Sequence, residues 1–365
     1  MKKALKVIMV AIAFAAVSEA AGNDGGSWDR KSAASYLDQR AAWWMDWKPA
    51  ARDHETFCIS CHTALPYALG RPALWPALGE SGPSAGEQRL IENVRKRVRL
   101  WAEVEPAYND AKSGPNKSVE SRGTEAVLNA LILMSYEARQ GKFGDDARAA
   151  LDNMLALQLK AGEQAGAINW LNFHNEPWEA DDSQYWGATL AAVAVGSAPE
   201  NYRSTSPVRE NVDLLRGYLL QQQVGQSVLN RVGLLWASAK LPGLLKPEQQ
   251  TAIAKEVWAL QREDGGWSAA SLLPPTWKRK DSTALDTRSD GYATGLLAFV
   301  LRQIGIARTQ PGMEKALAWL ERNQDKESGM WLATSLNKQR DPKSDAGKFM
   351  SDAATGYSVL ALEGK

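Results

Sequence analysis

The sequence predicts an all-α protein of the (α/α)6 toroid class, in which six outer helices surround six inner helices. The first observation is a repeated unit that consists of an amphipathic helix, a loop with Gly and Trp, and a second helix rich in small residues. Copies of the loop read "LQREDGGWSAA" at 260–270 and "LERNQDKESGMWLA" at 320–333. Trp267 and Trp331 occupy equivalent places in these copies, and such self-similarity indicates stacked supersecondary units.

The first helix of each unit is expected in the outer ring. Segments such as "RLIENVRKRVRLW" carry charges along one face, which is typical of a helix with one solvent-exposed side. We expect these six helices near 31–46, 86–103, 145–160, 208–223, 247–262 and 312–324.

The second helix of each unit is expected in the inner ring. Segments such as "YATGLLAFVL" are nearly free of charge, as in helices that are buried on all sides, and Ser or Asp usually precedes them as a cap. We expect them near 63–75, 124–138, 184–197, 226–240, 289–305 and 351–363. An open solenoid would need polar capping repeats at both ends, and the sequence shows none, so the ring should close.

The N-terminus predicts export. "MKKALKVIMVAIAFAAVSEAAG" has a basic head, an apolar run from Val7 to Val17, and a small-x-small site at Ser18 and Ala20. This is the pattern of a secretory signal peptide over residues 1–20, and an uncleaved N-terminal anchor is the alternative. We therefore expect a periplasmic or otherwise exported protein.

The remaining residues, 21–365, are expected to form a single toroid domain. Removal of the signal peptide changes the net charge from +1 to −1, because three Lys and one Glu are lost. A nearly neutral protein indicates neither nucleic acid nor an acidic membrane as a partner. No later segment is long and apolar enough for stable membrane insertion.

The motif "CISCH" at 58–62 contains both cysteines of the chain. C-x-x-C-H is the signature of covalent haem attachment: each thiol adds to one vinyl group, and the adjacent histidine lies under the iron. The sequence therefore predicts one haem c on Cys58 and Cys61, with His62 as the proximal iron ligand. A redox disulfide or part of a zinc site are the alternatives.

The predicted haem lies on the rim of the toroid. The motif stands between the two helices of the first pair, and long loops in other pairs gather at the same rim, where binding sites are usually built. Those loops could cover the haem, with Trp178 or Trp277 packed on its faces. The candidates for a sixth iron ligand are Met350, Met330 and His174, and an open or water-bound position is the alternative.

The repeat resembles a known family. "QREDGGW" at 261–267 and "NQDKESGMW" at 323–331 look like the QW motifs of squalene–hopene cyclases and their prenyltransferase-type relatives, and the resemblance covers about residues 140–363. It implies the toroid fold, and a role for the Gln of each motif in capping a helix end and stacking on the Trp, which ties neighbouring helix pairs together. By this resemblance, Gln261 pairs with Trp267 and Gln324 with Trp331.

The cyclases of that family protonate their substrate with an acid of a D-x-D-D-T-A motif at the head of an inner helix. Here "EADDSQ" stands at a comparable position, so the resemblance makes Asp181, with Asp182 beside it, a weak catalytic candidate. The first Asp has become Glu179, and the T-A has become Ser-Gln. Carboxylates before a helix are also favoured simply as caps.

Three functions are compatible with these features. The first is an exported electron carrier with a periplasmic redox partner protein. The second is a haem-dependent oxidoreductase that acts on a small organic substrate, and the third is residual cyclase activity through Asp181. A Met or His as sixth ligand would favour the carrier, because a saturated iron cannot bind a substrate.

Overall fold

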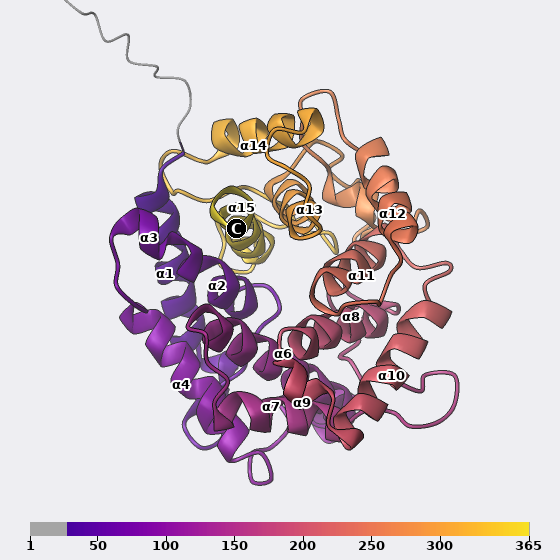
Figure 1. Ribbon diagram of the computed structural model, residues 1–365. Helices are drawn as coiled ribbons and strands as arrows, with labels where there is room; N and C mark the ends of the chain where they lie inside the picture. Colours follow the sequence, from indigo (N-terminus) through magenta and orange to yellow (C-terminus); the bar gives the residue numbers. More distant parts are fainter. Residues whose placement is uncertain (1–27, 365) are drawn as a thin grey trace, which may run out of the picture.

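The computed structural model describes residues 28–364 and is a ring of paired helices (Figure 1). The outer helices are α1 (Arg30–Asp46), α4 (Ala85–Arg99), α7 (Asp145–Ala156), α10 (Ser206–Gln221), α12 (Pro247–Ala259) and α14 (Pro311–Asn323). The inner helices are α2 (Ala64–Gly70), α6 (Lys117–Arg139), α8 (Ser183–Gly196), α11 (Val228–Lys240), α13 (Gly291–Gln303) and α15 (Phe349–Glu363).

The predicted all-α toroid is confirmed, with all twelve helices near their expected places. The signal peptide predicted at 1–20 lies outside the described residues. Among residues 28–364, no helix has both the length and the apolar character needed to cross a membrane.

Short elements complete the ring. They are η1 (Lys48–Ala50), β1 (Ala51–Arg52), β2 (Thr56–Phe57), η2 (Arg71–Leu74), α3 (Trp75–Leu78), α5 (Asp110–Ser113), α9 (Glu200–Arg203) and η3 (Ala269–Leu272). The two strands pair antiparallel just before the cysteine motif.

Two inner helices differ from their predicted bounds. Helix α2 ends early, and the chain continues as the tighter turn η2, which contains Pro72, because proline cannot continue an α-helical hydrogen-bond ladder. Helix α6 begins earlier than expected. Gly123, which precedes the predicted range of 124–138, lies inside the helix, where an added Cβ would come within 2.0 Å of the Asn169 carbonyl oxygen. That glycine allows close packing and does not end the helix.

Glutamines at the ends of three outer helices tie each helix pair to the next. Each side-chain amide donates to a carbonyl in its own loop and to one in, or just before, the following outer helix. Gln158 bonds to Gly166 and Asn211, Gln261 to Gly265 and Gly312, and Gln324 to Gly329 and Asp29. Because Asp29 precedes α1, the last of these bonds closes the ring.

The two motif tryptophans are fully buried beside these glutamines. The indole N–H of Trp267 donates to the Val257 carbonyl, and that of Trp331 to the Leu320 carbonyl, each at 2.8 Å. The glutamine of each motif therefore ties neighbouring helix pairs, as the resemblance implied.

We expect Trp331→Ala to lower the free energy of unfolding by about 3–5 kcal/mol, because it leaves a cavity next to the ring closure. Urea denaturation followed by circular dichroism measures this. The exposed neighbour Leu332 is the matched control, and Leu332→Ala should change stability by about 0.5 kcal/mol or less. Equal effects of the two changes would contradict the proposed role of Trp331.

Candidate functional site

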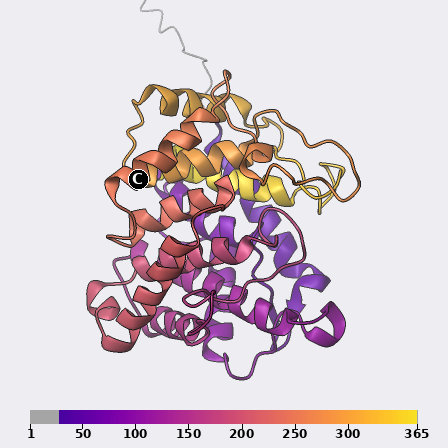
Figure 2. The same cartoon turned by 90° about the vertical axis from the view of Figure 1, so that its right-hand side faces the viewer.

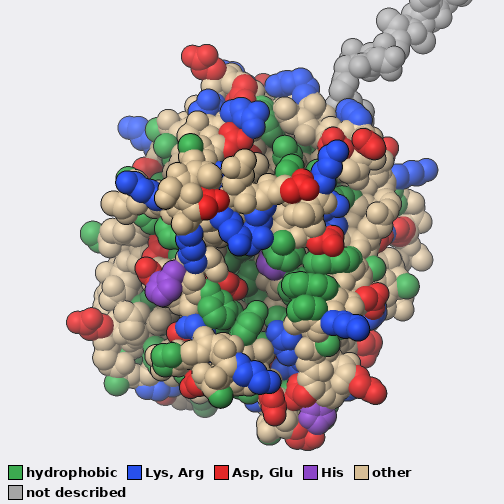
Figure 3. Space-filling view, turned by 180° about the vertical axis from the view of Figure 1, so that it is seen from behind, with side chains coloured by type: hydrophobic (Ala, Val, Ile, Leu, Met, Phe, Trp, Pro, Cys, Tyr) green, Lys and Arg blue, Asp and Glu red, His purple; other side chains and the backbone are tan. Residues whose placement is uncertain are grey.

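The loops that join outer to inner helices gather at one end of the ring, which we call the mouth. Figure 2 shows these long loops on the side away from the C-terminus, and Figure 3 looks into the mouth, where hydrophobic side chains line a hollow. The N-termini of the inner helices point to the same end. The predicted gathering of loops around the cysteine motif is therefore correct.

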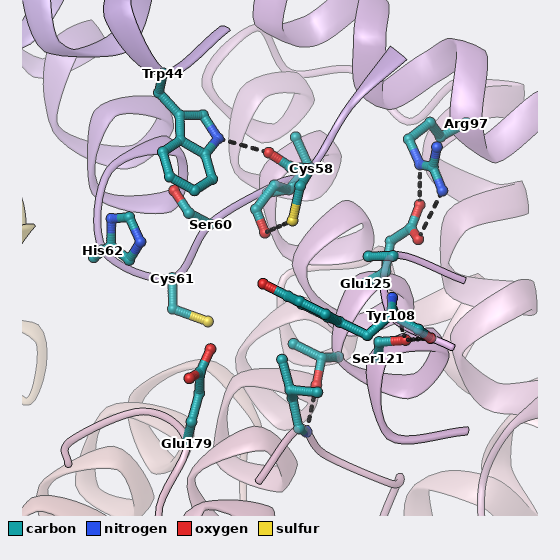
Figure 4. Close-up of a pocket in the computed structure, with 14 residues that line it drawn as sticks. Trp44, Cys58, Ser60, Cys61, His62, Arg97, Tyr108, Ser121, Glu125 and Glu179 are labelled. Carbon is teal, nitrogen blue, oxygen red and sulfur yellow. Dashed lines mark hydrogen bonds and ion pairs between the residues drawn. The ribbon is translucent and has the colours of Figure 1, made fainter. Parts of the chain in front are cut away.

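A small enclosed cavity lies in the mouth (Figure 4). Its volume is about 60 Å³, and it combines residues of the first three helix pairs. We call it the mouth cavity; the side chains that line it include Trp44, Cys58, Cys61, His62, Arg97, Tyr108, Glu125 and Glu179.

The cysteine motif is held rigidly at the wall of this cavity. The Trp44 indole donates to the Cys58 carbonyl at 2.7 Å, and the Cys58 N–H donates to the Ala50 carbonyl at 2.8 Å. The Ser60 hydroxyl accepts from two backbone N–H groups at the start of α2. Both thiols line the cavity, and burial raises the pKa of Cys58 to about 11 and that of Cys61 well above its usual value. They are protonated at neutral pH.

His62 is fixed in one tautomer by its neighbours. The Thr63 hydroxyl donates to an Asp352 oxygen at 2.7 Å, so it can only accept from His62, whose Nδ1 lies 2.8 Å away. Nδ1 therefore carries the proton, and Nε2 keeps a free electron pair. Burial lowers the pKa of His62 to about 3, so the ring is neutral. It stacks on Phe349 with ring centroids 3.8 Å apart.

Asp352 receives four hydrogen bonds in the core. Arg40 donates two of them, at 2.8 and 3.0 Å, and Tyr36 and Thr63 donate one each. Burial raises the pKa of Asp352, whereas the guanidinium and the two hydroxyls lower it. Because the Arg40 guanidinium and two hydroxyls all donate to it, we assign the Asp352 side chain as a carboxylate.

Glu179 enters the cavity from the loop before α8. Its backbone pairs with Asn175 in an antiparallel bridge, and in Figure 4 its carboxyl points toward Cys61. Burial raises the pKa of Glu179 to about 7, although Asn175, Lys280 and Lys117 oppose the shift. Tyr108 faces the same space, and burial raises its pKa to about 12.

A second carboxylate lies in the same lining. Both oxygens of Glu125, on α6, accept from the guanidinium of Arg97, whose side chain is only 1% exposed. Arg97 also donates to Thr56 and Asp53. Glu125 is therefore paired with a buried guanidinium in the same lining as Glu179.

The predicted sixth iron ligands lie elsewhere. Within the described chain, none of Met350, Met330 and His174 lines the mouth cavity. Met350 is buried in α15, Met330 borders a different hollow, and the His174 ring is 73% exposed and bonded to Asp181. The residue beside Met350, Phe349, takes the place over His62.

The cyclase-type acids are not in the cavity either. Asp181 is 78% exposed, and hydrogen bonds from Asn172 and His174 lower its pKa, so it is ionised and unsuited to protonating a substrate. Asp182 precedes α8, and its carbonyl accepts from Asn230. Sequence reasoning named Glu179 only as a departure from the family motif and missed Tyr108 and Glu125, which only the tertiary fold brings together.

The residues of the mouth cavity fit a haem only in part. The donors fit, because His62 Nε2 is free and both thiols face one space. The volume does not fit, because about 60 Å³ is far less than a porphyrin needs, and Tyr108 and Glu179 occupy the surroundings. Within residues 28–364, no three His, Cys, Asp or Glu side chains are grouped so that they could hold a metal ion. Haem attachment stays a prediction.

The comparisons with known proteins identify a fold and no family. No protein-family model and no curated protein matches the chain. The GH76A α-1,6-mannanase from Salegentibacter sp. HEL1_6 matches 91% of this chain and 100% of its own at 10% identity, with a TM-score of 0.52. A glycosidase variant matches 92% and 97% at 14% identity, with a TM-score of 0.50. At these identities, the likeness shows the α/α toroid alone.

The electron-transfer prediction is wrong. The mannanase and the glycosidase variant named above, which match over nine-tenths of the chain, both act on glycosides, and the three ligands that would have saturated the iron of a carrier lie outside the cavity. The alternative of a haem-dependent oxidoreductase is contradicted by the same comparison. Cyclase activity through Asp181 is wrong because that carboxylate is exposed and ionised.

Haem attachment has a direct test. If the prediction holds, the protein exported from a host with a haem-ligation system gives a c-type pyridine haemochrome and an intact mass with one haem. Cys58→Ala and Cys61→Ala should each change the spectrum, whereas Met350→Leu should not. An intact mass without haem would contradict the prediction.

Proposed function

We propose that this protein is a carbohydrate-active enzyme that hydrolyses a glycosidic bond at the toroid mouth, with Glu179 as the general acid. The observation that supports this most is the carboxyl group of Glu179 inside the mouth cavity (Figure 4), where burial raises its pKa to about 7. A carboxyl group with this pKa still carries its proton near neutral pH, as a general acid must.

A second carboxyl group completes the pair that most glycoside hydrolases use. Glu125 lines the same cavity and accepts hydrogen bonds from Arg97 at both oxygens, so the two carboxyl groups lie in different environments. In the proposed step, Glu179 gives its proton to the glycosidic oxygen as the C–O bond breaks. Water attacks the anomeric carbon, and its proton passes to Glu125.

The size of the mouth cavity indicates where each reactant would lie. About 60 Å³ has room for water, which takes about 30 Å³ a molecule in the liquid, but not for a sugar ring. The sugar would therefore lie in the hollow above, between the loops shown in Figure 3. The toroids that match include an α-1,6-mannanase, and an inactive variant of it is described in complex with α-1,6-mannotriose, so α-mannosides are the first substrates to test.

The proposal applies to the protein with free thiols. A porphyrin in the mouth cavity would displace Tyr108 and Glu179, so covalent haem would contradict it. Export, predicted from residues 1–20, suits an enzyme for extracellular polysaccharide, and we propose it as the localisation.

Glu179→Gln should lower kcat on the best substrate of a chromogenic glycoside and oligosaccharide panel by about 10²–10⁴-fold, because the amide cannot give up a proton. Glu163, which is exposed in the same loop, is the control, and Glu163→Gln should keep full activity. Full activity of the Glu179 variant would exclude it as the acid, and lack of hydrolysis across the panel would contradict the proposed function.

The pH profile gives a further test. Glu179 acts in its protonated form, so kcat/KM should fall as pH rises through about 7. A fall in kcat/KM near pH 4.5, the pKa of an exposed Glu side chain, would show that the acting acid does not lie in the mouth cavity. With substrates that carry a good leaving group, the Glu179→Gln variant should lose the fall through about pH 7.

A further inference from the structure

A second cavity lies at the end of the ring opposite the mouth, the end seen in Figure 1. We call it the basal cavity. It measures about 640 Å³, which is within the range of small-molecule sites. It is built from the C-terminal ends of the inner helices, whose apolar side chains form its floor: Leu69, Val193, Trp236, Phe299 and Leu360.

The charged groups of the basal cavity are unequally paired. Its two acids are already in ion pairs with arginines outside the cavity: Glu80 with Arg71 at 2.6 Å and Glu363 with Arg30 at 2.7 Å. Within the described chain, its two cations, Arg139 and Lys240, have no carboxylate in ion-pair distance. Arg139 donates to the Leu69 carbonyl at 3.0 Å. Among the described residues, the lining of the basal cavity therefore holds two cations without an ion-pair partner.

The two cations also lie close enough to repel each other. Burial lowers the pKa of Lys240, and the charge of Arg139 lowers it further. Each cation ends its own helix, α11 or α6, so the partial negative charge of a helix C-terminus offsets part of its cost. The helix dipole accounts for a cation at the end of each helix. It does not account for the placement of two cations together beside apolar side chains.

We propose that the basal cavity binds a carboxylate-headed amphiphile of the fatty-acid type. The head would lie between Arg139 and Lys240, where a carboxylate forms charge-assisted hydrogen bonds. The hydrocarbon chain would cover the floor at Trp236 and Phe299, which form an edge-to-face pair with centroids 5.2 Å apart. This site is separate from the mouth cavity and does not depend on the hydrolase function proposed above.

Isothermal titration with decanoate and with decan-1-ol tests the proposal on the whole protein. We expect one decanoate to bind per chain. Decan-1-ol should bind at least about tenfold more weakly, because it lacks the charge. Decyl phosphate distinguishes a phosphate-headed ligand, and equal or tighter binding of it would overturn the choice of a carboxylate.

Arg139→Gln and Lys240→Gln should each weaken decanoate binding by about tenfold. Lys240→Arg, which keeps the charge, should bind decanoate as the unchanged protein does. Lys255→Gln, an exposed change on α12, and Glu179→Gln in the mouth should leave binding unchanged. No saturable binding, or unchanged binding in both Gln variants with native circular dichroism, would overturn the proposal.

Discussion

The ion pair between Arg40 and Asp352 joins the two ends of the ring. Arg40 lies on the first outer helix and Asp352 on the last inner one, and their side chains are 7% and 2% exposed. A buried ion pair is maintained only when further hydrogen bonds satisfy both groups, and Tyr36 and Thr63 complete the set on Asp352. Because Thr63 also accepts from His62, the same carboxylate closes the ring and fixes the imidazole in the mouth. Ring closure and site geometry are therefore one interaction.

The ring and the mouth chemistry are otherwise carried by different residues. The glutamine ties and the buried tryptophans lie between helix pairs, whereas Glu179 and Tyr108 come from the long loops. Loops on a rigid scaffold can change their chemistry without a loss of core packing. This division explains how a chain with 10% identity to a mannanase keeps the ring while it places a cysteine motif at the rim.

The sequence was sufficient for the ring because both of its signals are local. Charge on one helix face distinguishes outer from inner helices, and the Gln and Trp of each loop mark the pair junctions. The site needed tertiary information. Glu179 and Asp181 are two residues apart, yet one carboxyl enters the cavity and the other is in solvent, because the bridge from Asn175 to Glu179 sets how this loop turns. Likewise, Met350 was a plausible ligand by position, but its neighbour Phe349 stacks on His62.

The protonation states of the mouth suggest what the cavity favours. Both thiols are protonated, His62 is neutral, and Glu179 is largely protonated below pH 7. The N-termini of the inner helices, which carry partial positive charge, point toward this end of the ring. Fixed dipoles in an enclosed site act without reorganisation on charge that develops during a reaction. In the proposed reaction, these dipoles would stabilise the Glu179 carboxylate that remains once the substrate has taken the proton.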